Sequence, residues 1–238
     1  MKESIRYRNT SEGIEFCHYQ IHKDSHQNKP VYTIQYSQGS MGSIPDCDAV
    51  IDENIDCINE DLIINSKIIY IEGYLFDQSD AKKAIYHCCK LAKVNNCKIA
   101  LSLSDSFCVD RHREELCNLI NKYVDIIFAN ETEIQSLYQS NLQESLKKIR
   151  EVTETGAITL GSKGSIVFQN QVKNLVPAII VNDPVDTTGA GDIFASGFLF
   201  GLINKYSIED CGKLGSKVAS DIIKHIGARP KILSLIHI

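Results

Sequence analysis

The sequence lacks an uninterrupted apolar stretch near the roughly 20 residues that a helix needs to cross a bilayer. It also lacks an excess of positive charge: 25 Lys and Arg stand against 30 Asp and Glu among 238 residues, a net charge of −5. These absences argue against a membrane span and against general affinity for nucleic acid or anionic lipid. The opening MKESIRYRNTSEG has no apolar h-region, which predicts a cytoplasmic chain without a signal peptide.

Paired cysteines are missing as well. The nine cysteines contain no C-x-x-C pair and no repeated spacing, whereas zinc sites need ligand pairs two to four residues apart. An odd number of cysteines without an export signal favours reduced thiols that pack as small apolar side chains.

What the sequence does contain is an alternation of short apolar runs and helical patterns from residue 66 onward. Its 43% hydrophobic and 23% charged residues are close to the averages of folded proteins. The predicted strands are Lys67–Ile71, Lys98–Leu103, Val124–Ala129, Ala157–Leu160, Ser165–Gln169 and Ala178–Val181. The predicted helices are Asp77–Val94, Val109–Lys122, Glu131–Tyr138, Leu142–Glu151, Ala190–Asn204 and Ile208–His225.

This order of elements predicts an α/β protein with a mainly parallel sheet and helices on both faces. Ligands of such sheets bind beyond the carboxyl ends of the strands. The first 65 residues differ: Tyr32–Tyr36 alternates like a half-buried strand, and Gly39–Ala49 carries turn residues and few core candidates.

The segment DTTGAGDIF, Asp186–Phe194, carries the clearest chemistry. Gly189 and Gly191 leave backbone N–H groups uncovered at the start of a helix, where unpaired N–H groups and the positive end of the helix dipole hold anions such as a phosphoryl group. Asp192 in the first turn could accept a hydroxyl proton beside that anion. Asp192 alone could equally stabilise the helix start, but that role explains neither the two glycines nor the two threonines.

Other nucleotide-binding motifs do not fit this chain. GAGDIF has Phe194 where the dinucleotide-binding G-x-G-x-x-G needs glycine, and no acidic ribose ligand follows on a later strand. The Walker motif G-x-x-x-x-G-K-[ST] is absent. Arg111, His112 and Arg113 are predicted to form a solvated helix face.

DTTGAGDIFASGF resembles the second signature of the PfkB-type (ribokinase-like) carbohydrate kinase family. The NETE segment at Asn130–Glu133 and the TLGSKG segment at Thr159–Gly164 resemble its N-x-x-E and nucleotide-loop motifs in the same order. IEGY at 71–74, SDSFCVDRHREEL at 104–116 and GARP at 227–230 are most similar to the adenosine-kinase-like branch. The resemblance is clear from about residue 60 and faint before it.

The resemblance implies a ribokinase-like three-layer α/β/α fold and a role for five residues of the DTTGAGD segment. Asp192 would be the base that takes a proton from the acceptor hydroxyl. The backbone amides of Gly189, Ala190 and Gly191 would bind the γ-phosphoryl group of ATP. Asp186 matches the position that orders a monovalent-cation loop in many members, so K⁺ activation is expected.

The resemblance also assigns the nucleotide side of the site. Asn130 and Glu133 would act through Mg²⁺ and its waters on the ATP phosphates. Thr159 and Gly161 would border the nucleotide, and Gly164 would shape the turn. The residues alone permit simpler interpretations: Asn130 and Glu133 could be a helix cap, and TLGSKG could be a hairpin turn.

The family's first signature, which supplies much of the acceptor site and the lid, has no counterpart in residues 1–62. We therefore expect a divergent remnant of the lid region in 1–62, with its strands incomplete, and a nucleotide-binding and phosphotransfer core in 63–238. Gly73 is predicted to border the acceptor. Two functions stay open: a kinase for a nucleoside or sugar, adenosine-like first, or a truncated nucleotide-binding remnant without turnover. Unpaired sheet edges also predict a homodimer.

Overall fold

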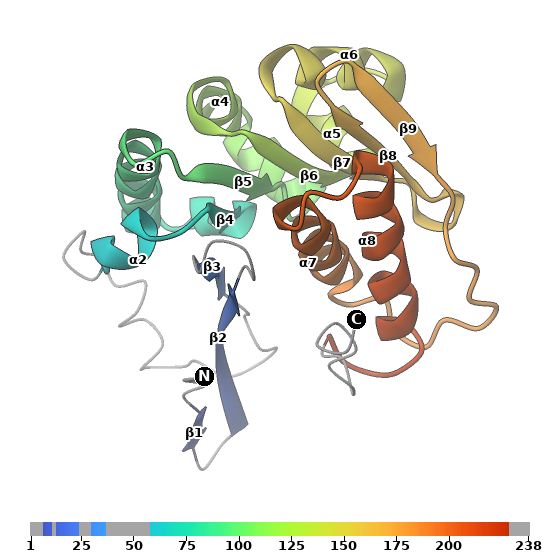
Figure 1. Cartoon of the computed structure of the whole chain (residues 1–238), viewed down its shortest axis with the longest axis horizontal. Helices are drawn as coiled ribbons and strands as arrows, with labels where there is room; N and C mark the ends of the chain where they lie inside the picture. The colour runs from blue at the N-terminus through green and yellow to red at the C-terminus, as the bar shows by residue number, and fades with distance from the viewer. Residues whose placement is uncertain (1–6, 11–12, 24–29, 37–57, 229–238) are drawn as a thin grey trace. The chain divides into compact units, whose positions relative to one another are not determined.

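The first unit of the chain, residues 1–126, is built on strands that follow one another in the sheet in chain order. The computed structural model describes residues 7–10, 13–23, 30–36 and 58–228 (Figure 1). The strands of this unit are β1 (Tyr7–Thr10), β2 (Gly13–Lys23), β3 (Pro30–Tyr36), β4 (Ile68–Glu72) and β5 (Lys98–Ser102). Its helices are α2 (Glu60–Ile64), the 3₁₀ turn η2 (Gly73–Asp77), α3 (Ser79–Val94) and α4 (Ser106–Tyr123).

The strands of this unit pair in both directions. β1 with β2 and β2 with β3 are antiparallel, whereas β3 with β4 and β4 with β5 are parallel, with Ile69 opposite Ile99. The strand predicted at Tyr32–Tyr36 is confirmed within β3, and the turn segment Gly39–Ala49 lies outside the described residues. All five residues of β4 are buried, as expected for a parallel strand that is covered on both faces.

The second unit, residues 127–238, starts within β6 and contains the remaining elements. These are β6 (Ile126–Asn130), α5 (Glu131–Tyr138), α6 (Leu142–Val152), β7 (Thr155–Thr159), the 3₁₀ turn η3 (Gly161–Lys163), β8 (Ser165–Gln169), β9 (Val172–Val176), α7 (Ala190–Ile203) and α8 (Ile208–Ile222). β7, β8 and β9 form two successive antiparallel hairpins. The predicted helices of this unit are confirmed to within a few residues at each end.

The prediction of a strand at Ala178–Val181 is wrong. The structure has no regular element there, and Ile179 and Ile180 are 45% and 70% exposed. The last strand is instead Val172–Val176, which pairs with β8 through the two-residue turn Asn170–Gln171. Asn170 takes the left-handed conformation, with φ of +53°, as two-residue hairpin turns require.

Helices α7 and α8 lie side by side along a seam of glycines (Figure 1). A Cβ atom at Gly197 would lie 2.9 Å from the Leu214 carbonyl oxygen and 3.0 Å from Cα of Gly215. A Cβ atom at Gly201 would lie 2.9 Å from Sγ of Cys211. The four-residue glycine spacing therefore brings the two helix backbones into close contact.

The cysteines of residues 58–228 are free thiols, as predicted, and Cys89, Cys97, Cys108 and Cys211 are buried. Burial raises the pKa of Cys89 to about 12. None of the helices in residues 58–228 combines the length and apolar character that a membrane span needs.

Candidate active site

Helix α7 begins from Gly189, its N-cap residue, which has φ of +74° and ψ of 4°. A Cβ atom at this position would lie 2.5 Å from Cβ of Ala228. Both the left-handed backbone and the lack of space therefore require glycine. No side chain caps this end of the helix, so its first N–H groups are not covered by a capping oxygen.

The N–H groups at this helix start have different partners. That of Ala190 donates to the carbonyl oxygen of Thr187, at 3.2 Å. Those of Gly189 and Gly191 have no acceptor among the residues that the structure describes, and a Cβ atom at Gly191 would meet open space. Uncovered N–H groups at the positive end of a helix dipole are suited to an anion. The family resemblance assigns the amides of Gly189, Ala190 and Gly191 to a phosphoryl group. Of these three, the Ala190 N–H also closes a turn through its bond to Thr187.

Asp192 is half-buried in the first turn of α7. Packing within the second unit anchors this helix: Phe198 lies edge-on to Phe128 of β6, with 5.3 Å between ring centroids, and stacks with Phe194 at 6.4 Å. Aromatic pairs of this geometry add to the stability that burial provides. The turn that carries Asp192 is thereby fixed to the strand that leads to Asn130.

Asp186 joins the DTTGAGD segment to the chain that follows α8. Its carboxylate accepts hydrogen bonds from the backbone N–H groups of Gly227 and Thr188, each at 2.9 Å. These bonds, with Gly227 first, lower the pKa of Asp186 from 3.8 to about 2. The neighbouring N–H of Val185 donates to the carbonyl oxygen of Ile223 at 2.8 Å. Both oxygens of the Asp186 carboxylate already accept N–H groups. Its predicted link to K⁺ stays a prediction.

Asn130 and Glu133 form a capping box at the start of α5, the simpler of the two interpretations that the sequence leaves open. The Asn130 side-chain oxygen accepts from Glu133 N–H at 2.8 Å, and the buried Glu133 carboxylate accepts from Asn130 N–H at 2.8 Å and from its amide nitrogen at 2.6 Å. Reciprocal bonds of this kind satisfy the first N–H groups of a helix. A role in metal binding would be additional to the cap.

The TLGSKG segment is the turn of the β7–β8 hairpin. Leu160 N–H donates to Gly164 O at 2.7 Å. Gly161 and Gly164 have positive φ values of +59° and +100°, a conformation in this turn that favours glycine. Thr159 Oγ1 lies 3.5 Å from the carbonyl oxygen of Ala129. This contact places the ends of β6 and β7, with the NETE and TLGSKG motifs, next to each other.

Gly73, the predicted acceptor residue, lies in the first unit, at the start of η2 and directly after β4. A Cβ atom there would lie 2.8 Å from the carbonyl oxygen of Leu103. The carboxyl end of β4 therefore approaches that of β5 at a distance that only glycine allows. Whether Gly73 borders an acceptor stays a prediction.

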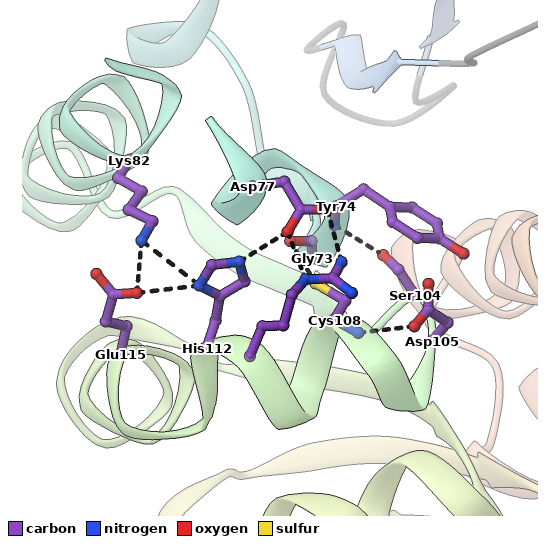
Figure 2. A network of polar contacts seen from close by, with 10 residues as sticks. Gly73, Tyr74, Asp77, Lys82, Ser104, Asp105, Cys108, His112 and Glu115 are labelled. Carbon is purple, nitrogen blue, oxygen red and sulfur yellow. Dashed lines mark hydrogen bonds and ion pairs between the residues drawn. The ribbon is translucent and has the colours of Figure 1, made fainter. Parts of the chain in front are cut away.

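The predicted solvated face is confirmed for Arg111, which is exposed, and is wrong for His112. Arg111 donates to the Asp77 carboxylate from Nε at 3.0 Å and from Nη2 at 2.8 Å. Figure 2 shows His112 beside the same carboxylate, and its Nε2 lies 2.7 Å from it. These hydrogen bonds, that of Arg111 foremost, lower the pKa of Asp77. His112 is only 14% exposed. Asp77 is 34 positions from Arg111, and no local sequence pattern signals such a contact.

The DTTGAGD segment, the capped NETE helix and the TLGSKG hairpin all lie within a stretch that matches one known family. The sequence profile of the pfkB family carbohydrate kinases matches residues 1–234. The chain belongs to this family. The match extends through the first 60 residues, where the sequence motifs alone give only a faint resemblance. The predicted ribokinase-like α/β fold is confirmed, with a mixed sheet.

Relatives within the pfkB family include nucleoside and sugar kinases. The adenosine kinase of Dictyostelium discoideum is 32% identical over 181 residues, covering 70% of this chain and 52% of that protein. The crystal structure of adenosine kinase from Sinorhizobium meliloti matches with a TM-score of 0.74 and 38% identity over 76% of this chain and 56% of the other. A probable sugar kinase from Rhizobium etli matches with a TM-score of 0.74 and 41% identity over the same shares. The chain thus spans about half the length of the relatives it matches.

Proposed function

We propose that this chain transfers the γ-phosphoryl group of ATP to a hydroxyl of a nucleoside, with an adenosine-like acceptor as first choice. The observation that carries the proposal is the start of α7. There, the N–H groups of Gly189 and Gly191 have no acceptor among the described residues, and the Asp192 carboxylate lies in the same first turn of the helix. Membership of the pfkB family supports a kinase, and similarity to two adenosine kinases supports the acceptor class.

In the proposed reaction, the acceptor hydroxyl oxygen forms a bond to the γ-phosphorus while the bond from that phosphorus to the β–γ bridging oxygen breaks. The hydroxyl proton passes to the Asp192 carboxylate, and ADP leaves with the bridging oxygen. Charge that develops on the transferring group is stabilised by the amides at the start of α7. Because such transfer depends mainly on positioning and charge neutralisation, a weak base is sufficient when the proton moves late.

The donor groups of the second unit suit a magnesium ion that arrives with the nucleotide phosphates. Among the described residues, no group of three or more His, Cys, Asp or Glu side chains could hold a metal directly. Both oxygens of Glu133 accept hydrogen bonds from Asn130, so Glu133 would contact the ion through water. Mg²⁺ in kinases characteristically keeps several waters and is held largely by substrate phosphates, whose negative charge it neutralises.

The test is acceptor-dependent release of ADP from Mg-ATP, measured with a panel of nucleosides and sugars, with and without K⁺. Asp192→Asn should lower the rate about 100- to 10,000-fold, the contribution of a positioned base, and leave ATP binding intact. Asp183→Asn is the matched control, since it removes an exposed carboxylate from the loop that leads into the DTTGAGD segment.

Each result decides between the two readings of the chain. Release with one acceptor, lost in Asp192→Asn and kept in Asp183→Asn, would support the kinase and identify its substrate. Transfer that survives in Asp192→Asn would rule out the proposed base. A folded chain that binds ATP but releases no ADP with any acceptor would be a nucleotide-binding protein without turnover.

A further inference from the structure

Ser104 stands at the carboxyl end of β5, beside the carboxyl end of β4, and has an unusual backbone conformation. Its φ of +66° lies in the left-handed region, which serine seldom occupies and which in non-glycine residues is concentrated at functional sites. The ends of adjacent parallel strands are also where α/β sheets bind ligands. Two exposed aromatic side chains, Tyr74 and Phe107, border this edge. Ser104 therefore occupies a position where a ligand is expected.

The hydrogen bonds of Ser104 define what it can still bind. Its Oγ donates to the buried Glu72 carboxylate at 2.9 Å and accepts from the Tyr74 backbone N–H at 3.3 Å (Figure 2 shows the second bond). A hydroxyl has one hydrogen and two lone pairs. The hydrogen and one lone pair are thus in use, and one lone pair is left on the oxygen of this half-buried residue. Ser104 can accept one more hydrogen bond but cannot donate one.

The surroundings of Ser104 are held rigid from three sides. Cys108 Sγ donates to Gly73 O at 3.1 Å, and the Asp105 carboxylate caps α4 through Cys108 N–H at 2.7 Å. Asp77 at the end of η2 is bound by Arg111 and His112 of α4, as described above. Recognition groups that are fixed before binding lose little entropy when the ligand arrives. The Ser104 lone pair is consequently preorganised.

We infer that Ser104 is a specificity-determining residue that accepts a hydrogen bond from one ribose hydroxyl of the acceptor. The inference rests on the proposed function, because that function supplies the acceptor class. The Glu72 carboxylate acts as a positioning group. Because it accepts the hydrogen bond that the Ser104 hydroxyl donates, the serine can only accept a further hydrogen bond. A site built in this way favours a ligand that carries the hydroxyl over an otherwise identical ligand that lacks it.

The test compares binding of adenosine with binding of 2′-, 3′- and 5′-deoxyadenosine by calorimetry, without ATP. The wild-type chain should bind one of the three analogues at least about 10-fold more weakly than adenosine. Ser104→Gly should bind adenosine and that analogue within about 2-fold, because the accepting oxygen is gone. Glycine suits a φ of +66°, so this variant should keep its thermal stability. Ser104→Ala should show the same loss of discrimination, and Ser79→Gly, at an exposed serine of α3, should keep it.

Several outcomes would overturn the inference. They are unchanged discrimination in Ser104→Gly, equal binding of all four ligands by the wild type, no binding of any of them, and failure of Ser104→Gly to fold. The last result would mean that the serine supports the fold rather than the ligand. Because binding is measured without ATP, discrimination by a chain that transfers no phosphoryl group would count against the proposed function alone.

Discussion

The seam between α7 and α8 makes a quantitative prediction about Gly197. In Gly197→Ala the new methyl group would lie 2.7 Å from Cγ2 of Val218, 2.9 Å from the Leu214 carbonyl oxygen and 3.0 Å from Cα of Gly215. Two of these atoms belong to the backbone of α8 and cannot turn away. Overpacking of this kind costs about 1–3 kcal/mol, whereas replacing glycine by alanine inside a helix stabilises by about 1 kcal/mol. Because the backbone atoms cannot move aside, we expect a cost in the upper half of that range, about 2–3 kcal/mol, and hence a net loss of about 1–2 kcal/mol in the free energy of unfolding.

The loss should appear as a lower urea midpoint and as a fall in melting temperature of roughly 3–6 °C for a chain of this length. Gly201→Ala should cost less, because its new methyl group would meet mainly the side chains of Cys211 and Leu214, which can adjust. Ser196→Ala, at a half-buried neighbour on the same helix, is the control and should change stability little. A Gly197→Ala chain as stable as the wild type would refute the reasoning, since the helices would then have room to separate.

Three further predictions concern single residues. Gly161→Ala should cost about 1 kcal/mol of stability because of the positive φ at this position. Gly164→Ala should cost more, because its Cβ would also collide with the Val176 carbonyl oxygen. Urea unfolding of both variants checks this, and equal losses would contradict it. The Asp186 carboxylate, with its pKa lowered from 3.8 to about 2, should order its loop above about pH 4 and release it as pH falls toward about 2. The amide protons of Thr188 and Gly227, which bond to this carboxylate, should lose their protection against exchange in NMR over that range, relative to the intrinsic rate at each pH, and unchanged protection would disprove the coupling. Cys89, whose pKa burial raises to about 12, should resist alkylation at about pH 8 until the chain is unfolded; rapid labelling of folded protein would show otherwise.

The sequence predicts best the features that are encoded by neighbouring residues. Helix α5 has the predicted bounds Glu131–Tyr138, because the cap at Asn130 and the acidic first turn act within four residues. The DTTGAGD segment is recognisable for the same reason, because Gly189 and Asp192 belong to one short stretch of the chain. Local chemistry of this kind needs no knowledge of the tertiary structure.

The sequence predicts poorly the features that depend on distant parts of the chain. The apolar run Ala178–Val181 reads as a strand, but the strand beside β8 is the more polar Val172–Val176, which lies at the sheet edge and does not need apolar residues on both faces. The contact of Asp77 with His112 forms only when α4 lies beside η2. The conformation of Ser104 is likewise set by the close approach of two strand ends.

The hydrogen bonds of residues 185 and 186 to residues 223 and 227 join the chain on both sides of the α7–α8 pair. These bonds close the α7–α8 pair into a loop whose two ends are joined. Restricting the conformation of residues 185–186 therefore also reduces the freedom of residues 223–227, and the reverse holds. An anion that orders the start of α7 would also tighten the chain that leaves α8. By thermodynamic reciprocity, any contact that holds residues 223–228 would strengthen anion binding by the same factor.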